Sequence, residues 1–446
     1  MISTNKSCIA AVAMLAIGAS HSSAQRSRID ATLAARVAAL AKSEADSDLL
    51  SGIVLIARGD HIFFQHAYGF ADWENHVPNS RSSRFGIGSI TKPMTETLVD
   101  VLAAEGRLDL SAPVAKYISG FPAGPKGTQP TIRDLVSHRS GVPHRVTTDV
   151  EEIEPFHPAD IVERVKKVGL LFEPGSQELY SSAGYTSLAR VVEIVEGKPF
   201  DTVLAARIFR PAGMSSATDE TGDQLMMNRA RPYKLSAGAS RVTVASAQYK
   251  DLTFLTGAGS VYATAEDLLH FVRALHDGKF GPVAGKLLGD AGDTTWNGIY
   301  GRINGYEGSI DYIPAQDLTL IFLSNLQSVA NWQLRDQFRN VLRGRPVFAI
   351  QNPPPIAPPF EDARAIVGAY DDAPDSIVIS QVDGRLYRDG DEVYPIVGGW
   401  YYEPVSGSTM RFARASDGSI DEMITHYSGG RPERRMKKLA STLRTR

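Results

Sequence analysis

Apolar and polar residues alternate along residues 51–70, around a short Arg58-Gly59-Asp60 turn. Two alternating runs joined by a glycine-containing turn are typical of a β-hairpin. Much later in the chain, the apolar run Leu318–Leu323 ends at Ser324-Asn325 and predicts a further strand. Strands are therefore expected at both ends of a long central region.

Within this region, from about residue 85 to about residue 340, apolar residues mostly recur at helical spacing. The segments with this spacing are Met94–Leu108, Asp160–Leu171, Gly184–Gly197, Phe200–Phe209 and Ala265–Leu275, and an Ala-rich segment at 28–45 precedes the hairpin. Helices between two groups of strands predict an α+β (α/β layered) fold, in which helices pack on one antiparallel sheet. We expect this domain to span residues 28–345.

A proline-rich segment at 346–360 follows, and it contains Asn352-Pro353-Pro354-Pro355. Such a run forms neither a helix nor a paired strand, so we expect a semi-rigid extended linker. Residues 361–440 then alternate short strand-like runs with turn pairs such as Asp383-Gly384 and Asp417-Gly418. The strand-like runs are 376–380, 385–387, 392–396, 400–403, 409–413, 420–427 and 434–438. Regular hairpin signals of this kind predict a small antiparallel β barrel or sandwich.

The first 24 residues have the pattern of an export signal. Lys6 supplies a positive charge, Cys8–Ile17 is an apolar run, and Ser22-Ser23-Ala24 offers small residues before Gln25. The apolar run is too short to span a membrane as a helix. We therefore expect a signal peptide at 1–24, and an exported protein that lies in the periplasm or outside the cell without stable membrane insertion. Cleavage removes Cys8, the single cysteine of the chain.

Charge and motif content exclude several classes of partner. The 446 residues carry 47 Lys and Arg against 50 Asp and Glu, a formal net charge of −3. This near-neutral balance gives no electrostatic reason to expect nucleic acid as a partner. The sequence has no metal-binding His-Glu-x-x-His and no phosphate loop, so we expect no metal and no cofactor. The Gly-x-Ser-x-Gly elbow of α/β-hydrolases is also absent, and nothing in the sequence predicts an oligomeric state.

The candidate catalytic motif is Ser89-Ile90-Thr91-Lys92, which lies where a strand-like segment ends and a helix begins. Residues three apart on a helix share a face, about 5–6 Å apart at Cβ. A serine hydroxyl is a poor nucleophile until a neighbour removes its proton, and a desolvated lysine can do so. Free N–H groups at a helix start can also stabilise charge that develops on an attacked carbonyl. On its own, the tetrapeptide is better explained as a helix cap followed by a solvated lysine, so the catalytic interpretation depends on its context.

That context is a series of segments in a fixed order. They are ADWENHVP (71–78), FGIGSITK (85–92), LAAEGRLDL (102–110), TIRDLVSHRSGVP (131–143), FEPG (172–175), IFRPAGM (208–214) and GSVYATAEDL (259–268). The series resembles the class C β-lactamases and penicillin-binding-protein-like serine hydrolases. The resemblance implies a β-lactamase/transpeptidase-like fold with a helical lobe, Ser89 as nucleophile, Lys92 as proton acceptor, and a C-terminal β domain of the accessory kind often appended to this family.

The family's second motif, Tyr-x-Asn, corresponds to Tyr180-Ser181-Ser182. The resemblance implies that Tyr180 helps to move protons to and from Ser89, and the charge of Lys92 is expected to favour a tyrosinate. Ser182 replaces the asparagine and keeps a hydrogen-bond donor and acceptor, so we expect it to contact substrate. His138 is expected to hold a loop by hydrogen bonds.

The third motif, Lys or His followed by x-Gly on an edge strand, aligns with Ile299-Tyr300-Gly301. Ile299 has no charge to attract a substrate carboxylate, which disfavours β-lactams and D-alanyl peptides as substrates. Gly301 still allows close approach of substrate, and the backbone N–H groups of Arg302 and Ser89 are expected to form the oxyanion hole. Gly301 and Arg302 thus join Ser182 as expected substrate-contacting residues.

Together these features predict an exported serine hydrolase that forms an acyl-enzyme on Ser89, with Lys92 and Tyr180 shuttling its proton. The expected partner is a small-molecule or peptide substrate, an ester or an amide. Two alternatives stay open. An inactive descendant could bind cell-wall peptide or another ligand, because Ile299 and Ser182 depart from the motifs. Alternatively, the C-terminal β domain could be a binding module that the larger domain presents.

Overall fold

The computed structural model describes residues 7–237, 242–281, 287–347, 354, 356–357, 363–372, 375–404, 408–426 and 433–439, with the backbone alone for 7–24 and 26. Its centre is a five-stranded antiparallel sheet with strand order β10-β11-β12-β1-β2. These strands are β1 (Gly52–Arg58), β2 (His61–Tyr68), β10 (Asn297–Ile303), β11 (Tyr306–Ile313) and β12 (Leu318–Ser324). The predicted hairpin and the predicted strand at Leu318–Leu323 are thereby confirmed, and β10 is an edge strand.

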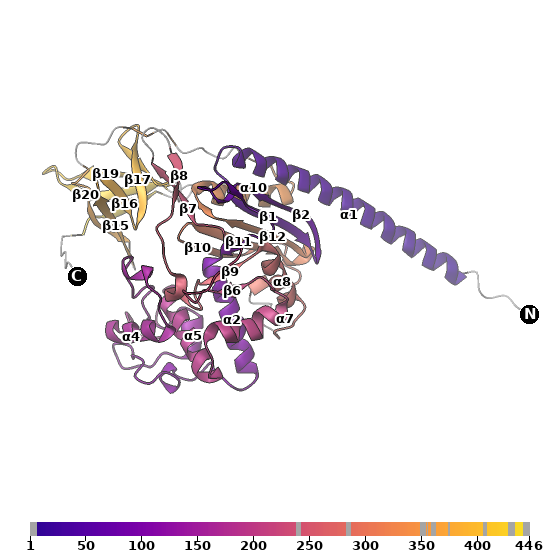
Figure 1. Ribbon diagram of the computed structural model, residues 1–446, viewed down its shortest axis with the longest axis horizontal. Coiled ribbons are helices and arrows are strands. Elements are labelled where there is room, and N and C mark those ends of the chain that lie inside the picture. The colour runs from indigo at the N-terminus through magenta and orange to yellow at the C-terminus, as the bar shows by residue number, and fades with distance from the viewer. Residues whose placement is uncertain are drawn as a thin grey trace, which may run out of the picture.

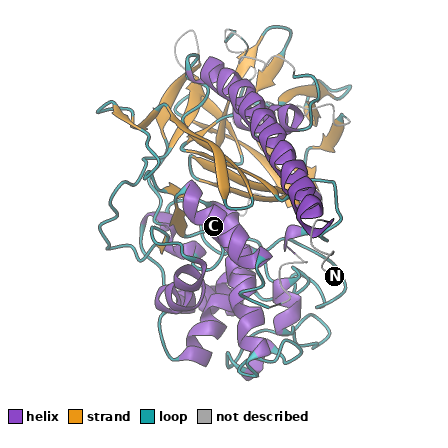
Figure 2. Ribbon diagram, turned by 90° about the vertical axis from the view of Figure 1, so that its right-hand side faces the viewer, coloured by secondary structure: helices purple, strands orange, loops and turns teal. Residues whose placement is uncertain are grey.

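The sheet is covered on both faces (Figures 1 and 2). One face packs against α1 (Ser7–Ala45) and α10 (Val329–Leu342), and the other packs against the helical lobe. Val54 and Ile56 of β1 point into the first of these cores, whereas Ile53 and Leu55 point into the second. Because both faces are buried, β1 reads as a continuous apolar run, unlike the alternation expected for the whole hairpin.

The helical lobe lies below the sheet in Figure 1. Its helices are α2 (Thr91–Ala104), α3 (Ile132–Val136), α4 (Pro158–Val168), α5 (Ser182–Glu196), α6 (Phe200–Leu204), α7 (Arg210–Ala212) and α8 (Ala265–His276). The expected helices exist, with shifted ends: α4 stops at Val168 because Gly169 adopts a φ of 81°. The helix expected at Phe200–Phe209 is α-helical only to Leu204 and continues as a π-helical turn, Ala205–Phe209.

Short strands join the sheet to the lobe. Strands β5 (Phe85–Gly86), β6 (Thr218–Asp219) and β9 (Val261–Ala263) form one small sheet. Strands β7 (Tyr233–Ala237), β8 (Val242–Ser246) and β13 (Leu326–Gln327) form another, and β3 (Phe70–Asp72) pairs with β4 (Val77–Pro78). In the second small sheet, β13 runs parallel to β7 and directly continues the chain of the central strand β12.

The C-terminal region is a nearly closed eight-stranded antiparallel barrel, as the turn pattern predicts. Its strands are β14 (Gly368–Asp372), β15 (Asp375–Val382), β16 (Arg385–Arg388), β17 (Asp391–Ile396), β18 (Trp400–Tyr402), β19 (Thr409–Arg414), β20 (Ile420–His426) and β21 (Arg434–Lys437). The first and last strands meet where Tyr370 bridges Lys438 and the N–H of Leu439 donates to the carbonyl of Ala369 at 2.8 Å. Most of the linker predicted at 346–360 lies outside the described residues.

The predicted export signal lies at the start of α1. Its basic residue, Lys6, falls outside the described residues, and the expected cleavage position lies inside a helix that runs without interruption from Ser7 to Ala45. Export therefore stays a prediction. Among the described residues, no helix combines the length and apolar character needed to cross a membrane.

Candidate active site

Ser89 is the middle residue of a 3-10 turn, Gly88–Ile90, between strand β5 and helix α2. The N–H of Ile90 donates to the carbonyl of Ile87 at 3.2 Å, which fixes the turn. Gly88 has a φ of 50°, a conformation that glycine adopts without strain. The strand-to-helix junction expected at this motif is therefore present, and it holds the serine at the start of a helix.

Lys92 lies in the first turn of α2, and its side chain is only 4% exposed. Its Nζ lies 3.2 Å from Ser89 Oγ, 3.3 Å from Ser182 Oγ and 2.8 Å from the carbonyl oxygen of Ala258. Burial lowers the pKa of Lys92 to about 7, because the ammonium form loses its hydration. Near neutral pH, Lys92 is thus available as a proton acceptor beside Ser89.

Tyr180 approaches Ser89 from the other side. Its hydroxyl donates a hydrogen bond to Ser89 Oγ at 2.7 Å. Burial raises the pKa of Tyr180, and the bond to Ser89 offsets this only in part. The tyrosinate expected from the sequence is therefore disfavoured, because burial favours the phenol and Lys92, with a pKa of about 7, is only partly charged near neutral pH. Tyr180 is a phenol that donates to the nucleophile.

Two histidines hold the segment that carries Tyr180. His138 Nδ1 accepts the N–H of Ser181 at 3.1 Å, and His144 Nδ1 accepts the N–H of Ser182 at 3.3 Å. The ring centroids of His138 and Tyr180 are 4.5 Å apart. Burial, and then the charge of Lys92, lower the pKa of His138 to about 4, so this imidazole is neutral and can accept. The expected role of His138 as a loop support agrees with these contacts, whereas no role was expected for His144.

The edge strand β10 packs directly against the turn that carries Ser89. A Cβ atom added to Gly301 would lie 1.8 Å from the carbonyl oxygen of Ile87, and one added to Gly88 would lie 2.9 Å from the backbone nitrogen of Arg302. Only two glycines facing each other allow this approach. The backbone of Arg302 thus lies beside the nucleophile turn, where the sequence places the oxyanion hole. Ile299 packs against the main core and offers no charge here.

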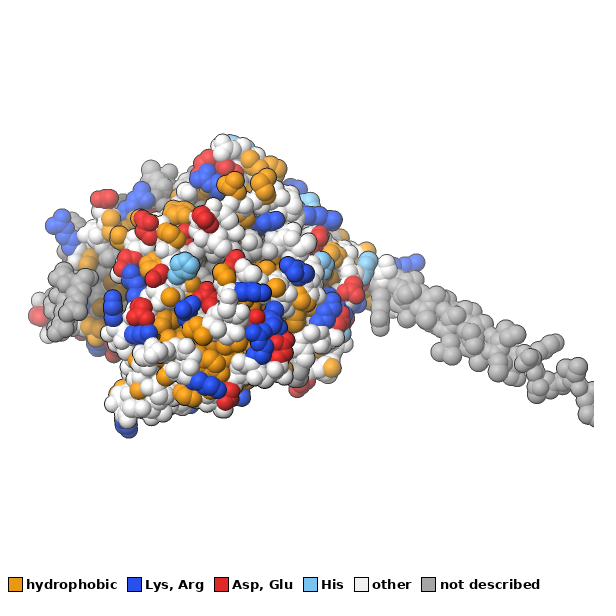
Figure 3. Space-filling model, turned by 60° about the horizontal axis from the view of Figure 1, so that its bottom comes forward, with side chains coloured by type: hydrophobic (Ala, Val, Ile, Leu, Met, Phe, Trp, Pro, Cys, Tyr) orange, Lys and Arg blue, Asp and Glu red, His pale blue; other side chains and the backbone are white. Residues whose placement is uncertain are grey.

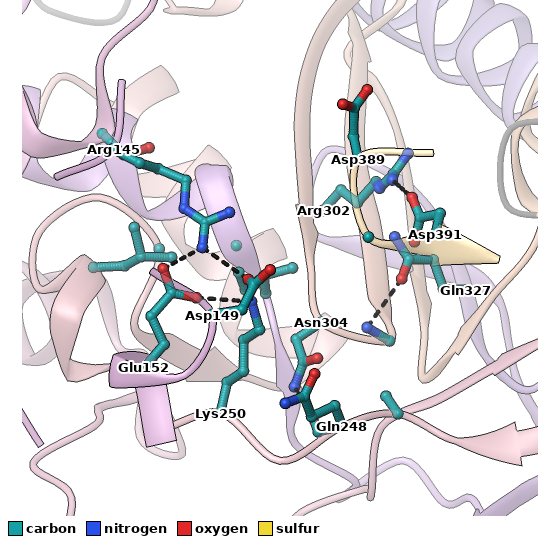
Figure 4. Close-up of a pocket in the computed structure, with 18 of the residues that line it drawn as sticks. Arg145, Asp149, Glu152, Gln248, Lys250, Arg302, Asn304, Gln327, Asp389 and Asp391 are labelled. Carbon is teal, nitrogen blue, oxygen red and sulfur yellow. Dashed lines mark hydrogen bonds and ion pairs between the residues drawn. The ribbon is translucent and has the colours of Figure 1, made fainter. Parts of the chain in front are cut away.

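These residues line a cleft with a volume of about 1070 Å³. The predicted residues Ser89, Tyr180, Ser182, Gly301 and Arg302 are all in its wall, and Lys92 lies beneath it. Residues of the barrel complete the wall, namely Ser380, Val382, Tyr387, Asp389, Gly390 and Asp391. The barrel is joined to the edge strand by an ion pair between Arg302 Nη2 and Asp391 Oδ2 at 2.5 Å (Figure 4). The barrel therefore shapes the cleft.

The opposite rim of the cleft carries a charged cluster (Figure 4). Lys250 Nζ lies 2.6 Å from Asp149 and 2.7 Å from Glu152, and Arg145 is bonded to the same two carboxylates. Glu152 is fully buried. No sequence signal singled out this cluster, because Lys250 lies about a hundred positions from Asp149 and Glu152 in the chain. Elsewhere, blue and red side chains are interspersed on the face shown in Figure 3.

Within the described ranges, no cluster of His, Cys, Asp or Glu has the arrangement of a metal site. The groups that the cleft brings together are a serine hydroxyl, a lysine with a pKa of about 7, a phenol, and backbone N–H groups.

A sheet with a helical lobe and a serine at a helix start defines a β-lactamase/transpeptidase-type protein. A family model described as Beta-lactamase matches residues 29–341. The chain belongs to the beta-lactamase family.

Relatives in this family are named for different activities. The chain is 31% identical over 229 residues to the putative penicillin-binding protein PbpX of Bacillus subtilis, across 51% of this chain and 56% of the relative. It is 26% identical over 277 residues to esterase EstB of Burkholderia gladioli, across 55% of this chain and 70% of that protein. The matched region is thus little more than half the length of the first of these.

The arrangement of the large domain and the barrel has a counterpart among solved structures. The crystal structure of SurE matches with a TM-score of 0.60 and 22% identity, and the match covers 92% of this chain and 99% of that one. At this identity the likeness concerns the fold alone.

Proposed function

We propose that the protein is a serine hydrolase of the Ser-x-x-Lys type, which cleaves an ester or an amide through an acyl-enzyme on Ser89. The observation that carries this proposal is the hydrogen-bonded set Tyr180 Oη, Ser89 Oγ and Lys92 Nζ, with 2.7 Å and 3.2 Å between neighbours. Penicillin-binding-protein-like and esterase relatives support the same class of reaction.

In the acylation step, neutral Lys92 accepts the proton of Ser89 Oγ as this oxygen attacks the substrate carbonyl. The carbonyls and hydroxyls around Nζ, those of Ala258 and Ser182, are acceptors that favour the ammonium once it forms. The backbone N–H groups of Ser89 and Arg302 are the proposed donors to the oxyanion.

The leaving group then needs a proton. Tyr180 is a protonated phenol next to Ser89 Oγ, so it can pass its proton to the leaving oxygen or nitrogen and regain one from Lys92. Water hydrolyses the acyl-enzyme by the same groups in reverse. Each step moves one proton between named atoms and needs no cofactor.

The substrate class follows from the third motif. With Ile299 in place of Lys or His, the third-motif position has no charge to bind a carboxylate next to the scissile bond, and the charge of the nearby Arg302 is paired with Asp391. We therefore propose that esters and neutral amides are better substrates than cephalosporins.

Steady-state kinetics test the proposal. We expect hydrolysis of p-nitrophenyl acetate and butyrate, loss of at least about a thousandfold in kcat for Ser89→Ala, and weak turnover of a cephalosporin. Equal rates for wild type and Ser89→Ala would refute the enzyme proposal and favour the inactive alternative. Strong cephalosporin turnover would refute only the role given to Ile299.

Export is proposed separately, on the pattern of residues 1–24. N-terminal sequencing of the protein secreted by a bacterial host is expected to begin at Gln25. A chain that keeps residues 1–24 and stays in the cytoplasm would contradict this.

A further inference from the structure

The charged residues of the cleft wall are nearly all neutralised by one another. Arg145 and Lys250 are bonded to Asp149 and Glu152, and Arg302 is bonded to Asp391 of the barrel. Lys234, on strand β7, also lines the cleft. Across the described part of the chain, its ammonium group has neither an ion pair nor a hydrogen bond. A cation left without a counter-ion in a cleft is a binding site for an anionic group.

A second donor lies beside this lysine. Lys234 pairs in register with Gln327 of the parallel strand β13, so both side chains project on the same face of the small sheet. Gln327 is only 5% exposed, and it too lines the cleft. Its Oε1 accepts the N–H of Gly305 at 3.1 Å, which fixes the orientation of the carboxamide (Figure 4).

The other end of that carboxamide is unused by the protein. Within the described residues, Nε2 of Gln327 donates to no group, although the side chain is nearly buried. Because Gly305 holds the carbonyl end and the nitrogen opens onto the cleft, this N–H2 group beside a lysine is oriented to donate to an acceptor on a ligand. A solvated lysine alone would explain Lys234, but it would not explain the oriented amide.

We propose that Lys234 and Gln327 form a subsite for a carboxylate, or a similar anionic group, at the far end of the substrate. The inference rests on the proposed hydrolase function and adds the substrate class: an elongated, peptide-like ester or amide with a negative charge away from the scissile bond.

The length of the substrate follows from the strand geometry. The Gly305 turn packs on β7, since a Cβ added to Gly305 would lie 2.8 Å from the backbone nitrogen of Tyr233. Strand β10 continues from Gly301, the residue next to the nucleophile turn, to Ile303, a rise of about 7 Å at about 3.4 Å per residue, before Asn304 and Gly305 turn the chain back into β11. An extended chain of about two to three residues spans this part of the cleft. The anionic group of the substrate would thus bind away from Ser89, at residues outside the third motif.

Matched pairs of substrates test the subsite. In the first pair, a p-nitrophenyl ester of a succinyl-dipeptide is compared with the same ester capped as methyl succinate. In the second pair, an acetyl-dipeptide is joined through an ester to a hydroxy-acid dipeptide with a free carboxylate or a carboxamide at its end. The two pairs place the charge on either side of the scissile bond. For wild type, we expect kcat/KM to be about tenfold higher for the charged member of one pair.

The substitution Lys234→Met is expected to bring that ratio close to one, with kcat/KM for neutral substrates unchanged, while Lys234→Arg keeps the preference. Gln327→Met is expected to reduce the preference for the charged substrate in part. Lys198→Met, at an exposed lysine outside the cleft, is the matched control and should change nothing.

Two outcomes separate the inference from the proposed function. The subsite is refuted if wild type hydrolyses the neutral and charged members equally, or if Lys234→Met lowers kcat/KM alike for both members. The proposed hydrolase function is not affected by either result. If no member of either pair is hydrolysed and Ser89 does not react with an acylating probe, the proposed function itself fails.

Discussion

At the scale of single residues, the central feature is a lysine that is almost completely buried next to a serine. Burial removes the hydration of the ammonium, and this lowers the pKa of Lys92 to about 7 from an ordinary value of 10.5. The same burial that makes Lys92 reactive is unfavourable for folding whenever the lysine is charged. Activity and stability are therefore linked through one proton.

The first prediction concerns activity. Because protonated Lys92 cannot accept the proton of Ser89, kcat/KM for a neutral ester is expected to rise with pH through about 7 and then to level off. Lys92→Arg, which stays charged, should lower kcat/KM by at least about a hundredfold at every pH. The measurement is a pH–rate profile from pH 5.5 to 9. A flat wild-type profile would contradict the role of Lys92.

The second prediction concerns stability. Between the folded pKa near 7 and the unfolded value near 10.5, the unfolded chain binds more protons at Lys92 than the folded protein does. The contribution of Lys92 to stability is therefore greatest above the unfolded pKa and is lost as the pH falls to about 7. Lys92→Met should unfold at a higher temperature than wild type at pH 6, with a smaller difference at pH 10.

Thermal unfolding followed by circular dichroism at the two pH values checks this prediction. Lys198→Met controls for the change in hydrophobicity at an exposed site. If Lys92→Met is less stable than wild type at pH 6, the lysine contributes packing or hydrogen bonds that outweigh its desolvation.

At the scale of secondary structure, the reactive arrangement depends on contact between the nucleophile turn and the edge strand β10. Gly301 leaves no room for a side chain, because a Cβ there would overlap the backbone carbonyl of Ile87 at 1.8 Å. Gly301→Ala is thus expected to push β10 away from Ser89 and to displace the N–H of Arg302. We predict a fall in kcat of about a hundredfold or more, the effect of losing one oxyanion donor.

Gly292→Ala is the matched control, since a Cβ at that position meets no atom within 4 Å. The two variants are compared by kcat/KM and by circular dichroism. Wild-type activity in a correctly folded Gly301→Ala protein would show that β10 does not supply the oxyanion donor.

Sequence patterns predict some of these elements better than others. The hairpin at 51–70, the helices near 184–197 and 265–275 and the barrel strands follow from local periodicity, and Ser89 with Lys92 follows from helical spacing. Strand β11 was missed because its buried residues include Glu307, Ser309 and Asp311. These polar residues interrupt the apolar pattern that would predict a strand. Their burial is compensated by hydrogen bonds from residues distant in sequence, such as Asn331 to Glu307 and Arg335 to Asp311.

At the scale of the whole molecule, the C-terminal barrel is part of the cleft. Arg302, whose backbone N–H is assigned to the oxyanion hole, is tied by its side chain to Asp391. Ser236 of β7 is also hydrogen-bonded to Glu392 of β17. No pattern in the sequence predicts these contacts, because they join segments about 90 and 160 positions apart, and only the packing of the two domains brings them together.

The fourth prediction is that the barrel helps to position β10 through this ion pair. Asp391→Asn should lower kcat several-fold, and Arg302→Gln should do the same, while the double variant should be no worse than either single one. The effect is expected to be modest, about 1 kcal/mol or less, because both side chains are partly exposed to water. Asp383→Asn, at an exposed hairpin tip of the same barrel, is the control.

A double-mutant cycle in kcat, together with thermal unfolding of each variant, measures this coupling. Strictly additive losses, or equal losses in Asp383→Asn, would mean that the barrel contributes general stability and does not position the edge strand.

The central claim is that Ser89 is the reactive nucleophile. Treatment with a fluorophosphonate, followed by intact-mass and peptide mass spectrometry, tests it most directly. We expect a single adduct on Ser89 in wild type, no adduct in Ser89→Ala, and labelling that becomes faster as the pH rises through about 7, the pKa of Lys92. An unlabelled wild-type protein, or an adduct on another residue that persists in Ser89→Ala, would contradict the account.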